Sequence, residues 1–274
     1  MAGATLSHVA SADGTRLAVW QSGSGPPLVA VHGTTADHSR WARVAPLLEA
    51  RFTLYAMDRR GRGGSGDNTP YSIQREADDI AAVVRAAGEA VTLLGHSYGA
   101  LCCLEAALQL PALHRLIAYE PPLPIGAGIM GQATRKELVQ RLGEGDREGA
   151  LQCFFREVVR VPEPELALLR AHPAWPARVV AAHTLLREAD AEESYGLDLR
   201  HLEGLKVPTL LMLGGASPDY FAEAVARLRA AIPGSRVHVM PGQQHIAMDT
   251  APEQFIAAVV GFALAESNEN EVTA

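Results

Sequence analysis

The chain has 274 residues, of which 48% are hydrophobic and 20% are charged, and its formal net charge is −7. Charges of both signs are interspersed without a basic cluster, which argues against a nucleic-acid partner and against attraction to a lipid surface. The first residues lack the basic and apolar regions of a secretory signal, and no uncharged apolar stretch reaches the roughly 18 residues of a membrane span.

The chain begins with a predicted β-hairpin and a buried strand. Residues 15–23 alternate between apolar and polar side chains, and residues 5–11 precede them across the turn sequence ADGT. This arrangement is typical of two antiparallel strands. Residues 26–33, PPLVAVHG, form a short continuous apolar run, which favours a strand covered on both faces.

Strands and helices then alternate. The further predicted strands are residues 52–58, 90–95, 114–120, 207–215 and 235–242. The predicted helices are residues 38–50, 72–88, 98–110, 219–234 and 251–266. Such alternation predicts an α/β fold, a mostly parallel sheet with helices on both faces, to which the first hairpin adds an antiparallel edge.

One long segment breaks this alternation. Residues 122–205 are dotted with prolines and rich in helix-forming residues, and they contain no clear strand. A connection of that length inside a compact sheet domain indicates an inserted unit. We therefore expect a core made of residues 1–121 and 206–274, and a helical cap made of residues 122–205 that covers the strand ends. The polar tail from residue 267 is expected to fray.

A single hydroxyl stands at the end of one predicted strand. In LLGHSYGAL, residues 93–101, Ser97 lies between Gly95 and Gly99, where the strand ends and a helix begins. Ligands of parallel sheets bind at the carboxyl ends of the strands. A sharp turn there crowds the residues two before and two after its apex, and glycines relieve that crowding. The pattern G-x-S-x-G thus predicts an exposed nucleophile, with the first helix amides directed at it.

Four segments carry a resemblance to a known family. VAVHG, DRRGRGGSG, LLGHSYGAL and MPGQQH occur in the order and spacing of the α/β-hydrolase superfamily, and the likeness spans residues 15–265. The resemblance implies an eight-stranded, mostly parallel sheet, a cap inserted after the sixth strand, and a nucleophile–acid–histidine triad. It also implies that no cofactor and no metal take part. The glycine-rich DRRGRGGSG lacks the Lys-Ser/Thr pair of a phosphate-binding loop, so we interpret it, with Asp58, as scaffold.

The chain order of the family selects the base among ten histidines. His245 follows the last predicted strand and its turn, where the family places its catalytic histidine. The acid is less regular, because Ser217 stands where most members carry an aspartate after the seventh strand. Some members place the acid after the sixth strand instead, and there this chain has Glu120. Asp219 is a second candidate, and we favour Glu120.

The resemblance also implies where an oxyanion would be held. One donor is the backbone amide of Tyr98, directly after the nucleophile, and the other is the amide of Thr34, with Thr35 as the near alternative. These residues together predict a serine hydrolase that cleaves a small-molecule ester, thioester or lactone. A cofactor-free lyase or proton-transfer enzyme on the same site, and a small-molecule receptor, remain alternatives.

The number and spacing of the cysteines indicate the cellular compartment in which the protein is expected. Cys102, Cys103 and Cys153 are odd in number and include an adjacent pair, which makes a poor disulfide framework. We therefore expect a cytoplasmic protein with a small-molecule substrate as its partner. The sequence leaves monomer and homodimer both open.

Overall fold

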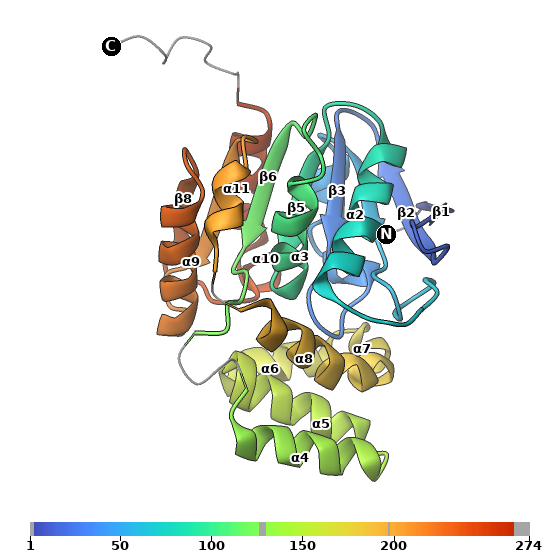
Figure 1. Cartoon of the computed structure of the whole chain (residues 1–274), viewed down its shortest axis with the longest axis vertical. Coiled ribbons are helices and arrows are strands. Elements are labelled where there is room, and N and C mark those ends of the chain that lie inside the picture. Colours follow the sequence, from blue (N-terminus) through green and yellow to red (C-terminus); the bar gives the residue numbers. More distant parts are fainter. Residues whose placement is uncertain (1–2, 126–129, 197, 266–274) are drawn as a thin grey trace.

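The computed structural model describes residues 3–125, 130–196 and 198–265. Within these residues the strands form one sheet of eight strands in the order β1-β2-β4-β3-β5-β6-β7-β8 (Figure 1). The strands are β1 Thr5–Ala10, β2 Arg16–Gly23, β3 Pro27–Val31, β4 Thr53–Met57, β5 Thr92–His96, β6 Arg115–Tyr119, β7 Thr209–Gly214 and β8 Arg236–Met240.

The sheet is parallel except at one strand. β2 pairs antiparallel with both β1 and β4, and every other neighbouring pair is parallel. This confirms the predicted mostly parallel sheet with an antiparallel hairpin at its edge. Parallel strands have their carboxyl ends at one edge of the sheet, so the loops that follow β3, β5, β6, β7 and β8 meet there.

Helices cover both faces of the sheet. Successive side chains of a strand point to opposite faces, so each buried strand contributes to the packing on both. Leu93 of β5 belongs to the hydrophobic cluster that contains α2 and α3, whereas Leu94 belongs to the cluster on the other face. The sheet-covering helices are α1 Ala45–Glu49, α2 Ile73–Ala87, α3 Tyr98–Ala107, α9 Asp219–Ala231, α10 Ala247–Thr250 and α11 Pro252–Ala263.

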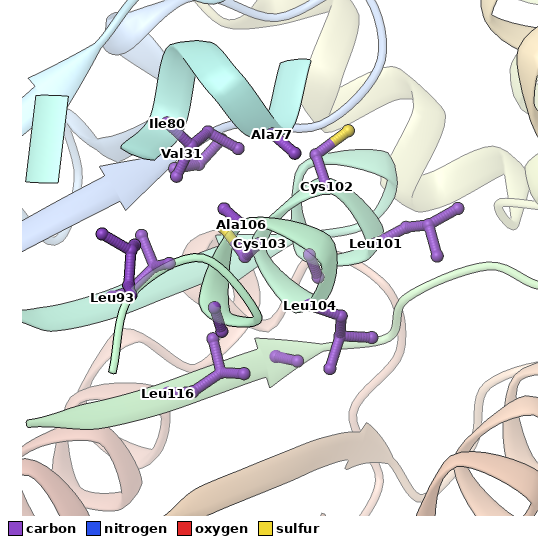
Figure 2. Close-up of a cluster of buried hydrophobic side chains, with 14 of the residues drawn as sticks. Val31, Ala77, Ile80, Leu93, Leu101, Cys102, Cys103, Leu104, Ala106 and Leu116 are labelled. Atoms are coloured by element: carbon purple, nitrogen blue, oxygen red, sulfur yellow. The ribbon is translucent and has the colours of Figure 1, made fainter. Parts of the chain in front are cut away.

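Helix α3 lies at the centre of the first of these clusters. Figure 2 shows Leu101 and two cysteines adjacent in the sequence, Cys102 and Cys103, among side chains from β3, β5 and α2. Both cysteines are free and buried, and burial raises the pKa of each thiol well above its usual value. They are packing residues in a neutral state, as expected of buried thiols.

The predicted helix over residues 38–50 is divided in the structure. A 3-10 turn, His38–Trp41, begins where the Asp37 side chain accepts a hydrogen bond from the Ser39 amide. α1 begins only at Ala45, next to Pro46. Proline has no N–H and cannot continue a helix from the preceding turn, but it suits the first turn of a new one.

The described part of the chain between β6 and β7 contains helices and turns and no strand. We call α4 to α8 the cap helices: α4 Gln132–Gly143, α5 Arg147–Cys153, α6 Glu163–Ala171, α7 Trp175–Ala181 and α8 Leu185–Tyr195. A π-helical turn, Phe154–Val159, continues α5. They pack around a hydrophobic cluster of their own, which Ile246 of the loop after β8 joins.

The cap helices lie beyond the sheet edge where β6 ends (Figure 1). The carboxyl ends of the parallel strands lie at this edge, so the cap helices stand over them. Among the described residues, no helix combines the length and the apolar character needed to cross a membrane.

Candidate active site

The turn between β5 and α3 displays Ser97. Its backbone has φ 56° and ψ −132°, a positive φ that non-glycine residues rarely adopt. The Ser97 amide still donates to the carbonyl of Tyr119, 2.8 Å away, so β6 holds the turn in place. A strained backbone of this kind costs about 1–3 kcal/mol and persists only where the surroundings impose it.

Two glycines make that turn sterically possible. A Cβ atom on Gly95 would lie 2.5 Å from the Ala100 Cα and 2.8 Å from the Cys103 Sγ. A Cβ atom on Gly99 would overlap the carbonyl oxygen of His32 in the loop after β3. Any larger residue would therefore push α3 away from the sheet. The G-x-S-x-G spacing thus has the steric cause that the sequence predicted.

The loop after β3 approaches the serine equally closely. A Cβ atom on Gly33 would lie 2.8 Å from the Ser97 Cβ. Thr34 is partly exposed, whereas Thr35 is fully buried with φ 58°, and its hydroxyl donates to the Thr34 carbonyl at 2.7 Å. Tyr98 is the first residue of α3, so its amide has no acceptor within the helix. Both sequence-predicted oxyanion donors thus come from segments that touch Ser97.

Glu120 and His245 meet at the end of the neighbouring strand. His245 Nδ1 lies 2.6 Å from the Glu120 Oε2, and both residues are buried. The other carboxylate oxygen, Oε1, accepts hydrogen bonds from the Gly214 amide at 2.7 Å and the Ser217 hydroxyl at 2.5 Å. Glu120 itself has φ 46°, a second strained residue at the same sheet edge. Three donors therefore hold this buried carboxylate.

The two candidate acids differ sharply in position. Asp219 is exposed in the first turn of α9, where the helix dipole favours a carboxylate. Glu120 is the candidate that the structure brings within hydrogen-bond distance of His245. Ser217, at the position where the sequence lacks an aspartate, turns its hydroxyl to the glutamate instead.

Three aromatic rings fix the loop that carries His245. The Phe221 ring stacks on the imidazole with a centroid distance of 4.6 Å and an interplanar angle of 16°. The Tyr119 hydroxyl donates to the Gln244 carbonyl. His96 Nε2 lies 2.9 Å from the His245 carbonyl oxygen, and since burial lowers the pKa of His96 well below its usual value, this neutral ring donates its proton there.

Two cavities surround Ser97 beneath the cap helices. One has about 430 Å³ of space free of atoms and the other about 350 Å³, in each case including space open to solvent. Both are lined by the same five residues: Thr34, Ser97, Phe154, Val159 and His245. The structure thus brings the predicted nucleophile, the predicted base and one predicted oxyanion residue to two neighbouring cavities that share part of their lining.

Each cavity also has an ionisable residue that the sequence did not mark as part of the site. Arg178 of α7 lines the smaller cavity, and Glu192 of α8 lines the larger one. Burial and the neighbouring Glu188 and Glu193 raise the pKa of Glu192 well above its usual value, which favours the protonated carboxyl. The cap sequence contains many arginines and glutamates at helical positions and no motif marks these two, so only tertiary packing distinguishes them.

The glycine-rich loop supports the site without entering it. Asp58 is buried and accepts hydrogen bonds from the amides of His38 and Gly64 and from the Trp20 indole. Asp37, His38 and Asp58 lie close enough together to resemble a metal-ligand group. Protein donors already occupy the Asp58 oxygens, which supports a structural role for Asp58 and its loop.

Comparisons with known proteins agree with this architecture. The model of the Alpha/beta hydrolase family matches residues 28–258. N-formylmaleamate deformylase from Pseudomonas putida is 28% identical over 247 residues, covering 88% of this chain and 89% of the relative. A pimeloyl–acyl-carrier-protein methyl ester esterase from Edwardsiella ictaluri is 30% identical over 251 residues, covering 86% of this chain and 92% of the relative. The crystal structure of an alpha/beta hydrolase from Sphaerobacter thermophilus has a TM-score of 0.81 at 35% identity and covers 93% of this chain and 99% of its own.

Proposed function

Because the chain belongs to the alpha/beta hydrolase family, we propose that it is a serine hydrolase that cleaves small-molecule carboxylic esters, thioesters or lactones through an acyl-enzyme. The observation that carries the proposal is the Glu120–His245 hydrogen bond of 2.6 Å beside a cavity that Ser97 also lines. A buried carboxylate, an imidazole and a displayed hydroxyl in one place are the parts of a nucleophile–base–acid triad.

The first step would be attack of the Ser97 oxygen on the substrate carbonyl. His245 takes the serine proton on Nε2, since Glu120 already occupies Nδ1. The negative charge of Glu120 then stabilises the imidazolium. Its three hydrogen bonds hold the carboxylate in place throughout.

The negative charge that develops on the substrate oxygen would be held by the amides of Thr34 and Tyr98. Losing one such donor typically costs about 2.7–4 kcal/mol of transition-state stabilisation. We assign the loop donor to Thr34 and not to Thr35, because Thr34 lines both cavities whereas the Thr35 side chain is buried behind it. His245 then returns its proton to the leaving group. Water next attacks the acyl-enzyme with His245 as its base, and the acid product leaves as Ser97 regains its proton.

The names of the relatives support acyl cleavage as the reaction class. One is named for removing a formyl group and the other for cleaving a methyl ester. Both names describe attack at a carbonyl carbon, which is the step that an activated serine performs.

Kinetics of single-residue variants on p-nitrophenyl butyrate would test the proposal. Ser97→Ala and His245→Ala should each lower kcat about 10⁴-fold or more, by analogy with triads in which either residue was removed. A fluorophosphonate should label the wild type and leave Ser97→Ala unlabelled. Turnover of the ester by Ser97→Ala at the wild-type rate would rule out serine catalysis.

A further inference from the structure

Arg178 is a buried cation at the candidate site. It lies in α7, it is 8% exposed, and it lines the cavity that also contains Ser97 and His245. Its guanidinium carries five N–H donors. The recorded hydrogen bond of this group is a long one, 3.5 Å from Nη1 to the Thr35 hydroxyl.

No carboxylate of the described residues forms an ion pair with Arg178. Arg40, the other cation of this cavity, has a partner, because its guanidinium lies 2.6 Å from Asp249. An unpaired buried charge is costly, so buried arginines are normally paired with an anion. Arg178 therefore differs from the buried arginines of the scaffold, such as Arg59 with Glu76.

The surroundings of Arg178 favour an anion from outside the protein. The residues that line the smaller cavity include no aspartate or glutamate. Burial and the neighbouring Arg40 lower the pKa of Arg178 to about 10, so the guanidinium stays charged at neutral pH. The nearby Asp249 and Asp37 offset this only in part, and each already contacts another group: Asp249 the guanidinium of Arg40, and Asp37 the Ser39 amide.

We propose that Arg178 binds a carboxylate of the substrate, so that the enzyme acts on acyl compounds with a free carboxylate in addition to the bond that is cleaved. The planar guanidinium matches a carboxylate in two parallel hydrogen bonds, which fixes orientation as well as position. Since Arg178 also contacts the loop that carries Thr34, the bound carboxylate would hold the scissile carbonyl in the same cavity as Ser97. This inference rests on the proposed hydrolase function.

The test compares matched esters in the wild type and in Arg178→Gln. One pair, p-nitrophenyl hemiglutarate and p-nitrophenyl pentanoate, places the charge on the acyl half. The other pair, 4-acetoxybenzoate and its methyl ester, places the charge on the leaving group. In at least one pair the wild type should prefer the charged ester in kcat/KM, and Arg178→Gln should reduce that preference about 10- to 100-fold, the value of a hydrogen bond to a charged group.

Two control variants separate recognition from a structural role. Arg178→Lys keeps the charge and loses the paired donors, so its preference should be intermediate. Arg170→Gln removes an exposed arginine of the cap and should keep the wild-type preference. The inference is overturned if the wild type prefers the neutral ester in both pairs, or if Arg178→Gln lowers charged and neutral esters by the same factor.

Binding of glutarate tests the inference apart from catalysis. In calorimetry, Ser97→Ala should bind glutarate at least about 10-fold more tightly than Ser97→Ala/Arg178→Gln or Ser97→Ala/Arg178→Lys. Equal binding by these proteins would overturn the carboxylate site even if fluorophosphonate labelling of the wild type upheld the hydrolase. Arg178-dependent binding in a protein that neither reacts with fluorophosphonate nor hydrolyses esters would uphold the site and reject the reaction.

Discussion

The Ser217 hydroxyl donates a hydrogen bond to Glu120 across 2.5 Å, and the second oxygen of the same carboxylate contacts His245. In the family pattern the residue after the seventh strand is the acid itself. In this chain that position supplies a donor to an acid that comes from β6. A carboxylate at both positions would place two like charges side by side, so a neutral hydroxyl at residue 217 is what a glutamate at 120 requires.

The first prediction concerns the acid. Glu120→Gln should lower kcat on p-nitrophenyl butyrate about 10³- to 10⁴-fold, because an amide cannot stabilise the imidazolium and favours the wrong imidazole tautomer. Asp219→Asn is the matched control and should stay close to the wild-type rate, since Asp219 is exposed. A large loss in Asp219→Asn with a small one in Glu120→Gln would exchange the two assignments.

The second prediction concerns the donor to that acid. Ser217→Ala should lower kcat about 10-fold with little change in KM, since a hydrogen bond to a charged group contributes about 1.5–3 kcal/mol and two other contacts of Glu120 remain. Ser217→Thr keeps the hydroxyl and should restore most of the activity. Equal losses in the alanine and threonine variants would mean that the position is sensitive to shape and not to the hydrogen bond.

The third prediction concerns the steric basis of the serine turn. Gly99→Ala should destabilise the fold by about 1–3 kcal/mol, the usual cost of overpacking, because its Cβ would overlap the His32 carbonyl. Gly261→Ala is a matched control within α11, where nothing lies within 4 Å of the added Cβ. It should stabilise the protein by up to about 1 kcal/mol. Urea denaturation monitored by circular dichroism measures both, and a Gly99→Ala protein as stable as the wild type would contradict the account.

The fourth prediction concerns the buried carboxyl of the larger cavity. Burial raises the folded-state pKa of Glu192 well above its usual value. As the pH rises, the carboxyl of Glu192 therefore loses its proton in the unfolded chain before it does so in the folded protein. Above about pH 4.5 this difference lowers the free energy of unfolding. Glu192→Gln removes that cost, so its stability relative to the wild type should increase from pH 4 to pH 8. Chemical denaturation at the two pH values would measure the difference, and a constant difference would show that Glu192 is not held neutral.

The chemistry-bearing residues that the sequence predicted are those marked by local backbone geometry. Ser97 stands out because glycines flank it on both sides: Gly95 makes room for α3, and Gly99 makes room for the loop after β3. Glu120 and His245 each end a strand or follow one, and parallel strands bring such ends together whatever the intervening chain does. The resemblance to the family selected these two residues, and strand order explains why residues 125 positions apart lie together.

What the sequence did not reveal depends on the packing of the cap. Arg178 is the one charged residue of α7 and is buried, and α8 carries buried and exposed carboxylates side by side. The sequence pattern alone does not say which of these residues turn inward. The 38–50 segment was predicted as a single helix because its apolar spacing is helical, but Pro46 starts a new helix there. In both cases a specific steric or tertiary contact overrides the local pattern.

The most direct test of the central claim is peptide mapping of the protein quenched with acid during turnover of p-nitrophenyl butyrate. A butyryl group is expected on the peptide that carries Ser97. Turnover with the acyl group on another residue, or with no covalent intermediate under conditions that trap a control serine esterase, would contradict the central claim.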